Sequence, residues 1–163
     1  MNFRRCTLTA LATVTALWMA APLALADDRS DIIAVLNHWS TNSSADCADD
    51  AAVIDSFPPF EWHGAGGCAK WQKDSDAEMK AQGMTNTAAT IGKPRQLTIT
   101  GDRAYAVAPI TFAFTQQGKR ISTKGMTTFT LVKTAAGWRI TGWAYAALGT
   151  INKKRLQRSK LID

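Results

Sequence analysis

The chain has 163 residues, with 19 lysines and arginines against 13 aspartates and glutamates and a formal net charge of +6. This length fits a single domain with an ordinary hydrophobic core, so folding needs neither a structural metal nor a dense set of disulfides. The positive charge comes without an RNA-binding motif or a recognition-helix pattern, which argues against a nucleic-acid-binding protein.

The first 26 residues have the pattern of a secretory signal peptide. Two arginines precede an apolar run from Leu8 to Leu25, and Ala24-Leu25-Ala26 has the small-x-small pattern of a cleavage site. The run is short and broken by Pro22, which favours a signal peptide over a transmembrane helix. We therefore expect cleavage before Asp27, a periplasmic or secreted mature chain, and no transmembrane segment after processing.

Two cysteines, Cys47 and Cys68, remain after this cleavage. Two thiols in an exported protein most simply form a disulfide, here closing a loop of about 20 residues and contributing about 3 kcal/mol. Two buried free thiols are the alternative. A metal site is a weaker interpretation, because neither histidine stands at a ligand-like spacing from these cysteines.

The front of the mature chain predicts three helices, over residues 28–42, 46–55 and 68–82. The first carries one apolar stripe at helical spacing, made by Ile32, Val35, Leu36 and Trp39. The second rests on the spacing of Cys47, Ala51 and Ile54. Between the second and third helices, Pro58-Pro59 stops any helix, and Phe60–His63 fits a short strand.

The back of the chain predicts an antiparallel meander. Its strands are expected over residues 88–91, 96–100, 103–116, 120–134 and 138–148. Alternation is clearest in Arg103–Gln116, where both faces carry apolar residues. The outer face is therefore expected to be covered by a partner or by the chain's own elements, and we expect a homodimer through it. We also expect a kink or bulge at Gly125 and a bend at Gly142. Helices followed by a meander indicate an α+β domain.

Several stretches carry a resemblance to a known superfamily. They are VIDSFPPFEWHGAGGCAKW, GDRAYAVAPITFAF, GMTTFTLVK and AAGWRITGWAYA, together with the first helix. They resemble the SnoaL-like, nuclear transport factor 2-like superfamily, which includes ketosteroid-isomerase-like proteins, and within it an exported bacterial subgroup of uncharacterised role. The resemblance implies a cystatin-like cone over residues 27–150: three helices packed on a strongly curved antiparallel sheet, with a cavity between them. Residues 151–163 then form a basic tail, expected to be a solvated terminus.

Enzymes of this superfamily place an acid inside the cone, often with a histidine or tyrosine. Asp55 and His63 are the best candidates here, since a carboxylate that orients an imidazole creates a general base at neutral pH. The structural alternative is that Asp55 stabilises the turn at Ser56 while His63 lies at the cone mouth or on the surface. The last strand lacks the pocket acid of SnoaL-type cyclases, which weighs against inherited cyclase chemistry.

Five aromatic residues are candidates for lining a ligand pocket, with core packing as their alternative role. They are Trp62, Trp71, Tyr105, Trp143 and Tyr145. We find no metal spacing, phosphate-binding glycine loop or dinucleotide fingerprint, so no cofactor is expected. Three hypotheses follow: a module that binds a small apolar or aromatic molecule, an isomerase, dehydratase or cyclase using Asp55 and His63, or an interaction module acting through its sheet face.

Overall fold

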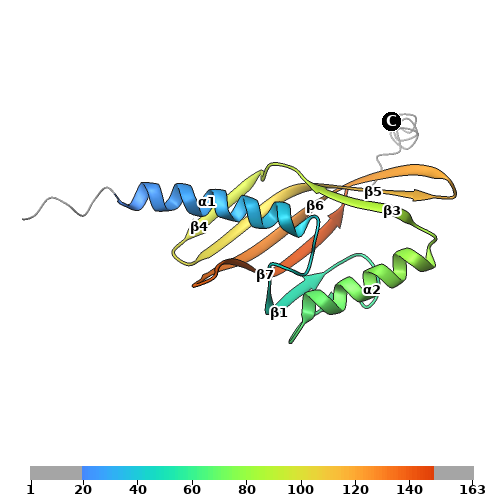
Figure 1. Cartoon of the computed structure of the whole chain (residues 1–163), viewed down its shortest axis with the longest axis horizontal. Coiled ribbons are helices and arrows are strands. Elements are labelled where there is room, and N and C mark those ends of the chain that lie inside the picture. The colour runs from blue at the N-terminus through green and yellow to red at the C-terminus, as the bar shows by residue number, and fades with distance from the viewer. Residues whose placement is uncertain (1–19, 149–163) are drawn as a thin grey trace, which may run out of the picture.

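The computed structural model describes residues 20–148, which form an α+β fold of two helices and seven strands (Figure 1). In chain order these are α1 (Ala20–Trp39), β1 (Cys47–Ile54), β2 (Glu61–Trp62), α2 (Gly67–Ala81), β3 (Thr85–Ile91), β4 (Gln96–Thr100), β5 (Arg103–Gln116), β6 (Lys119–Thr134) and β7 (Gly137–Ala147). The α+β prediction is therefore confirmed. The basic tail and most of the predicted signal peptide lie outside the described residues. The backbone of 20–26 continues α1, and cleavage before Asp27 stays a prediction.

The sheet is mixed, whereas the sequence predicted an antiparallel one. Its strand order is β2-β1-β7-β6-β5-β3, and β4 pairs with the remaining length of β5. The one parallel pairing in the described sheet joins β1 to β7. The helix α1 packs on β3, β4 and β7, whereas α2 packs on β1 and β2 beside the other end of the sheet (Figure 1).

The predicted helix over residues 46–55 is wrong, because this segment is strand β1. Ala51 and Val53 are buried and alternate with the exposed Ala52 and Ile54, which is a strand pattern. The helical spacing that included Ile54 was a coincidence, since that side chain is 53% exposed. The described residues consequently contain two helices, not three, and β1 instead occupies the place beside β7.

The predicted meander is close to the observed one. The expected strands 96–100 and 103–116 have the bounds of β4 and β5. The β5–β6 ladder has no bulge at Gly125, since β6 pairs with β5 without interruption through this residue. A Cβ at Gly125 would lie 2.3 Å from Cε2 of Tyr145, so glycine is required here to accommodate the tyrosine ring. The irregularity lies in β7, where the β6–β7 register shifts beside Gly142.

The core lies between α1 and the middle of the sheet. Ile32, Leu36 and Trp39 are almost fully buried, which confirms most of the predicted stripe. The ring of Trp39 meets Phe129 of β6 edge to face, with centroids 5.0 Å apart. Burial of side chains this large contributes about 1.5–3 kcal/mol each, so α1 is held mainly by apolar packing.

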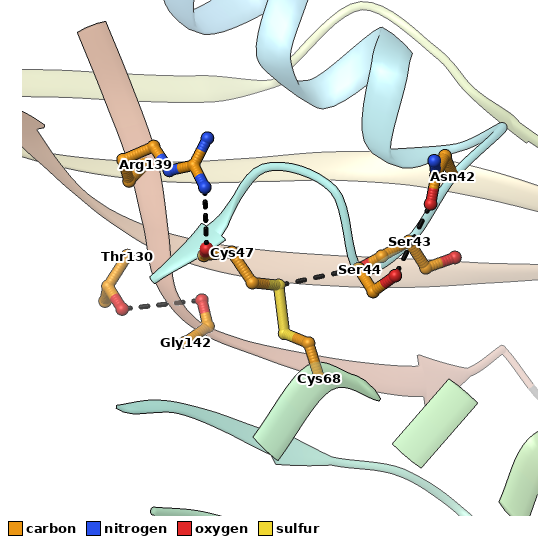
Figure 2. The surroundings of a disulfide bond; sticks show 8 residues. All are labelled: Asn42, Ser43, Ser44, Cys47, Cys68, Thr130, Arg139 and Gly142. Carbon is orange, nitrogen blue, oxygen red and sulfur yellow. Dashed lines mark hydrogen bonds between the residues drawn. A yellow bond between two sulfur atoms is a disulfide. The ribbon is translucent and has the colours of Figure 1, made fainter. Parts of the chain in front are cut away.

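The predicted disulfide joins Cys47 at the start of β1 to Cys68 in the first turn of α2 (Figure 2). Beside it, the guanidinium of Arg139 donates to the carbonyl oxygen of Cys47 at 3.2 Å. The disulfide fixes the N-terminal end of α2 against the sheet. Neither of the two described helices is long and apolar enough to cross a membrane.

Candidate functional site

A cavity of about 720 Å³ lies among α2, the end of α1, the turn after β1 and the inner face of β3, β5 and β7. This volume falls within the range of small-molecule sites, roughly 300–1,000 Å³. Its aromatic lining comes from both helices, the turn after β1 and two strands. The residues are Trp39, Phe57, Trp71, Phe112, Phe114, Trp143 and Tyr145.

Asp55 places a carboxylate on the cavity wall at the point where β1 ends. Its Oδ2 accepts a hydrogen bond from the indole Nε1 of Trp71 at 2.9 Å, and its Oδ1 accepts one from the backbone N–H of Ser56 at 2.6 Å. The N–H of Asp55 itself donates to the carbonyl of Phe60, which closes the turn. The carboxylate is thus oriented by neutral donors, and within residues 20–148 it takes part in no ion pair.

Tyr145 of β7 lies in the same cavity. Burial raises the pKa of its phenol above 10.0, a hydrogen bond with Thr123 acts in the opposite direction, and the negative charge of Asp55 raises the pKa further. Tyr145 therefore stays neutral at physiological pH and offers a hydrogen-bond donor rather than an anion.

Three tryptophans form a contiguous cluster at the cavity. The ring of Trp143 meets Trp71 edge to face, with centroids 4.6 Å apart, and meets Trp39 at 5.0 Å. The indole N–H groups of Trp39 and Trp143 are buried and have no acceptor among the described residues. Such unpaired buried donors are uncommon in folded proteins, and they mark this cluster as different from an ordinary apolar core.

The structure brings three of the five predicted aromatic residues to the cavity, namely Trp71, Trp143 and Tyr145. Trp62 is buried elsewhere, where its indole donates to Asp74 at 2.8 Å and its ring packs on Phe57. Tyr105 lies on the opposite face of β5 from the buried alanines and is 39% exposed. These two residues do not line the cavity.

Asp55 and His63 are not brought together. Asp55 lines the cavity, whereas the side chain of His63 is 74% exposed and its Nδ1 lies 3.6 Å from Oε1 of Glu61. The two residues are close in sequence, but Asp55 directly follows β1 whereas His63 directly follows β2. A base that combines them is therefore absent from this arrangement, and Asp55 alone remains at the site.

Several cavity residues were not among the sequence candidates. Trp39 was assigned to the buried face of α1 alone, and it also lines the cavity. Phe112 and Phe114 continue the inward-facing positions of β5, so the alternation of that strand could have pointed to them. Two acids of α2, Asp76 and Glu78, complete the wall. No group of three or more potential metal ligands occurs within residues 20–148.

Comparison with family models and with curated proteins found no match in sequence. Solved structures do match. A nuclear transport factor 2-like protein with a cystatin-like fold from Novosphingobium aromaticivorans shares 23% identity at a TM-score of 0.63, covering 85% of this chain and 93% of that one. The chain has the nuclear transport factor 2-like fold. The resemblance inferred from the sequence is thereby confirmed at the level of fold.

Two further matches support the same fold. A protein of unknown function from Mycobacterium tuberculosis shares 12% identity at a TM-score of 0.66, covering 83% of this chain and 80% of that one. A ketosteroid isomerase-like protein from Erwinia carotovora shares 14% identity at 0.54, covering 81% and 99%. Fold alone does not carry function, so these likenesses leave the chemistry to be argued from the cavity.

Proposed function

We propose that this protein binds a small molecule with an apolar or aromatic body in the cavity between α2 and the sheet. The observation that carries the proposal is the size of this cavity together with its lining by seven aromatic side chains. Such a lining favours flat or apolar ligands, while a few polar groups fix their orientation. Here Asp55 offers an acceptor, and Tyr145 offers a donor.

The binding site is proposed to act outside the cytoplasm. The predicted signal peptide supports export, and a disulfide between Cys47 and Cys68 fits an oxidising compartment. The periplasm or the medium surrounding the cell is therefore the place where a ligand would be met.

The proposal is tested by titrating the protein with the neutral fluorescent dye N-phenyl-1-naphthylamine. We expect saturable binding of one dye per chain. Phe112→Ala removes an aromatic wall of the cavity and should weaken binding about tenfold, a change of about 1.4 kcal/mol. Tyr105→Ala removes an aromatic ring from the opposite face of the sheet, so its affinity should stay unchanged. Absence of saturable binding, or equal losses in both variants, would contradict the proposal.

A natural ligand can be sought in parallel. Protein purified from its own host under non-denaturing conditions should show an added mass by native mass spectrometry, which organic extraction removes. The Phe112→Ala variant, treated identically, should carry less of this mass. A compound retained equally by both proteins does not occupy the cavity.

The enzyme hypothesis keeps one favourable observation, the oriented carboxylate of Asp55 on the cavity wall. An isomerase, dehydratase or cyclase that also uses His63 would need this exposed histidine to move to the cavity. Replacing His63 with alanine should therefore leave ligand binding unchanged. A loss of binding in His63→Ala would favour the enzyme hypothesis over the binding module.

We also propose that the outer face of the sheet pairs two copies of the chain. One cross-strand row on this face runs from Ile54 through Ala144 and Thr128 to Val107, and it carries no charge. Light scattering coupled to size exclusion should give a dimer mass, and Val107→Lys should give a monomer. A monomeric native protein would favour the third hypothesis, in which this face meets a different protein.

A further inference from the structure

The cavity has a charge opposite to that of the chain. Its wall carries three carboxylates, from Asp55, Asp76 and Glu78, and within residues 28–148 no lysine, arginine or histidine lines it. The whole sequence has 19 basic residues against 13 acidic ones, so a wall drawn at random from the chain would favour the opposite sign. The lysines of α2 at positions 70, 73 and 80 do not line the cavity.

Asp55 is the best placed of the three carboxylates to meet a ligand. Its residue is half-buried and its oxygens accept hydrogen bonds from Trp71 and Ser56, neither of which neutralises the negative charge. By contrast, the buried Asp28 is paired with the ammonium of Lys133. Asp55 thus has no cationic partner among the described residues, and it lies in a partly desolvated aromatic site, where an attraction to a cation is stronger than in water.

The aromatic side chains that line the cavity also favour a cationic ligand. The faces of indole, phenol and phenyl rings attract cations, and several rings around one space form the cages that bind organic ammonium groups. Trp71 and Trp143 stand almost perpendicular, at 89°, so rings from α2 and β7 border the cavity in different orientations. Together, Asp55 and these rings offer two independent attractions to one positive charge.

We propose that the ligand of this cavity is an organic cation, an amine or quaternary ammonium attached to an apolar body. The inference rests on the proposed binding function and names the chemical class of its ligand. The ammonium lies against Asp55 and the indole rings, while the apolar body extends toward Phe112 and Phe114. The net charge of the chain does not prevent entry, because charges farther away than about 8 Å are screened at physiological salt.

The test compares three probes that share one body and differ in head group: 4-phenylbutylammonium, 4-phenyl-1-butanol and 4-phenylbutyrate. Dissociation constants are measured on the native full chain by calorimetry or by quenching of tryptophan fluorescence at neutral pH. We expect the ammonium to bind at least about tenfold more tightly than the alcohol, and the carboxylate to bind most weakly. Added salt should weaken binding of the ammonium and leave the alcohol unaffected.

Matched variants locate the charge. Asp55→Asn should weaken binding of the ammonium about tenfold, because one opposite charge in a partly desolvated site is lost. Its effect on binding of the alcohol should be less than about twofold. Asp102→Asn alters an exposed acid at the β4–β5 turn and should change neither probe. If Asp55→Asn does not fold, a variant that combines Asp76→Asn and Glu78→Gln is used instead. It should lose less affinity for the ammonium than Asp55→Asn would, and its affinity for the alcohol should not change.

The outcomes separate the two proposals. If the native protein binds the alcohol as tightly as the ammonium, or if the preference survives loss of the acids, the cation inference is overturned while the binding function stands. If none of the three probes binds, the proposed function itself is contradicted. A preference for the ammonium that disappears in Asp55→Asn supports both.

Discussion

The helix α1 lies on the sheet through an apolar stripe that is almost completely buried, whereas α2 presents a much thinner buried face. In α1, Ile32, Leu36 and Trp39 are each at most 3% exposed. In α2, the larger buried side chains are Trp71 and the disulfide-bonded Cys68. The first helix closes its side of the sheet, and the second spans an open cavity.

An indole N–H donates to an aspartate at both helices, but only one of the two aspartates is also paired with a lysine. At α1, the indole of Trp138 donates to Asp28 at 3.0 Å, and Lys133 neutralises that carboxylate. At α2, the indole of Trp71 donates to Asp55 at 2.9 Å, and this cavity-lining carboxylate has no cationic partner in the part of the chain that the structure describes. α1 is fastened by packing and an ion pair, and among its described side chains only Trp39, at its end, lines the cavity. α2 is fastened by a disulfide and polar contacts at its edges, and more of its side chains line the cavity.

This contrast predicts that the disulfide matters most for α2. Replacing Cys47 and Cys68 together with serine should lower the free energy of unfolding by about 3 kcal/mol, because the closed loop of about 20 residues no longer restricts the unfolded chain. The corresponding fall in Tm is about 10 °C. Thermal unfolding followed by circular dichroism measures it.

Thiol labelling gives the control for that experiment. The native mature protein should incorporate no alkylating reagent unless it is first reduced, since both cysteines are paired. Full labelling without reductant would show that the bridge does not form, and the serine variant would then be expected to match the native Tm.

The contribution of Asp28 to the stability of α1 should decrease at acidic pH. Hydrogen bonds from Lys133 and then from Trp138 hold the pKa of Asp28 below 3.8. A lowered folded pKa means that the stabilisation is complete above the unfolded value, about 3.9, and is lost as the pH falls toward the folded value. Asp28→Asn should lower Tm by about 5 °C at pH 7 and have a smaller effect at pH 3.

The measurement is a series of melting curves from pH 3 to pH 7 on both proteins. The difference between the two Tm values is the informative quantity, because other carboxylates titrate in both and cancel. A difference that stays constant across this range would mean that the charge of Asp28 contributes nothing to α1.

The sequence predicted the meander well because its turns have local signals. Gly101, Gly118 and Gly137 adopt positive φ at the ends of β4, β5 and β6, and such positions favour glycine. The strands between them alternate over more than ten residues. Both signals are contained in a few neighbouring residues, so no knowledge of the tertiary structure is needed.

The corner between residues 46 and 67 was harder because its structure depends on distant partners. β1 becomes a strand by pairing in parallel with β7, about 90 residues later, and a register shift between Cys47 and Ala52 interrupts its alternation. The cavity depends on the same long-range contacts. Asp55 could be chosen as a candidate from sequence, but its distance from His63 and its bond to Trp71 could not.

A matched pair of substitutions sharpens the contrast between the helices. Trp138→Phe and Trp71→Phe each remove one indole N–H bonded to an aspartate and the same volume. Trp138→Phe should cost more stability, about 2 kcal/mol against about 1, because the donor and acceptor at α1 are both buried and a hydrogen bond to a charged group contributes more there.

The effect of these two substitutions on ligand affinity should have the opposite order, with the larger change in Trp71→Phe. Trp71→Phe frees the carboxylate of Asp55 from its donor and should change binding of the aromatic probes, whereas Trp138→Phe should leave it unaltered. Chemical unfolding gives the stabilities, and the dye titration gives the affinities. If both variants lose the same stability and show the same affinity for the dye, the two indole–aspartate contacts do not differ in function.

The smallest expected effect is a shift in the titration of Tyr145. The chain has two tyrosines, so Tyr105→Phe leaves Tyr145 as the only one, and its ionisation can be followed by ultraviolet absorbance. The midpoint should lie above 10.0, because burial and the charge of Asp55 both disfavour the phenolate. Adding Asp55→Asn removes the second cause and should lower the midpoint while keeping it raised. An unchanged midpoint would mean that the carboxylate of Asp55 does not act on the interior of the cavity, and the attraction proposed for a cationic ligand would lose its main source.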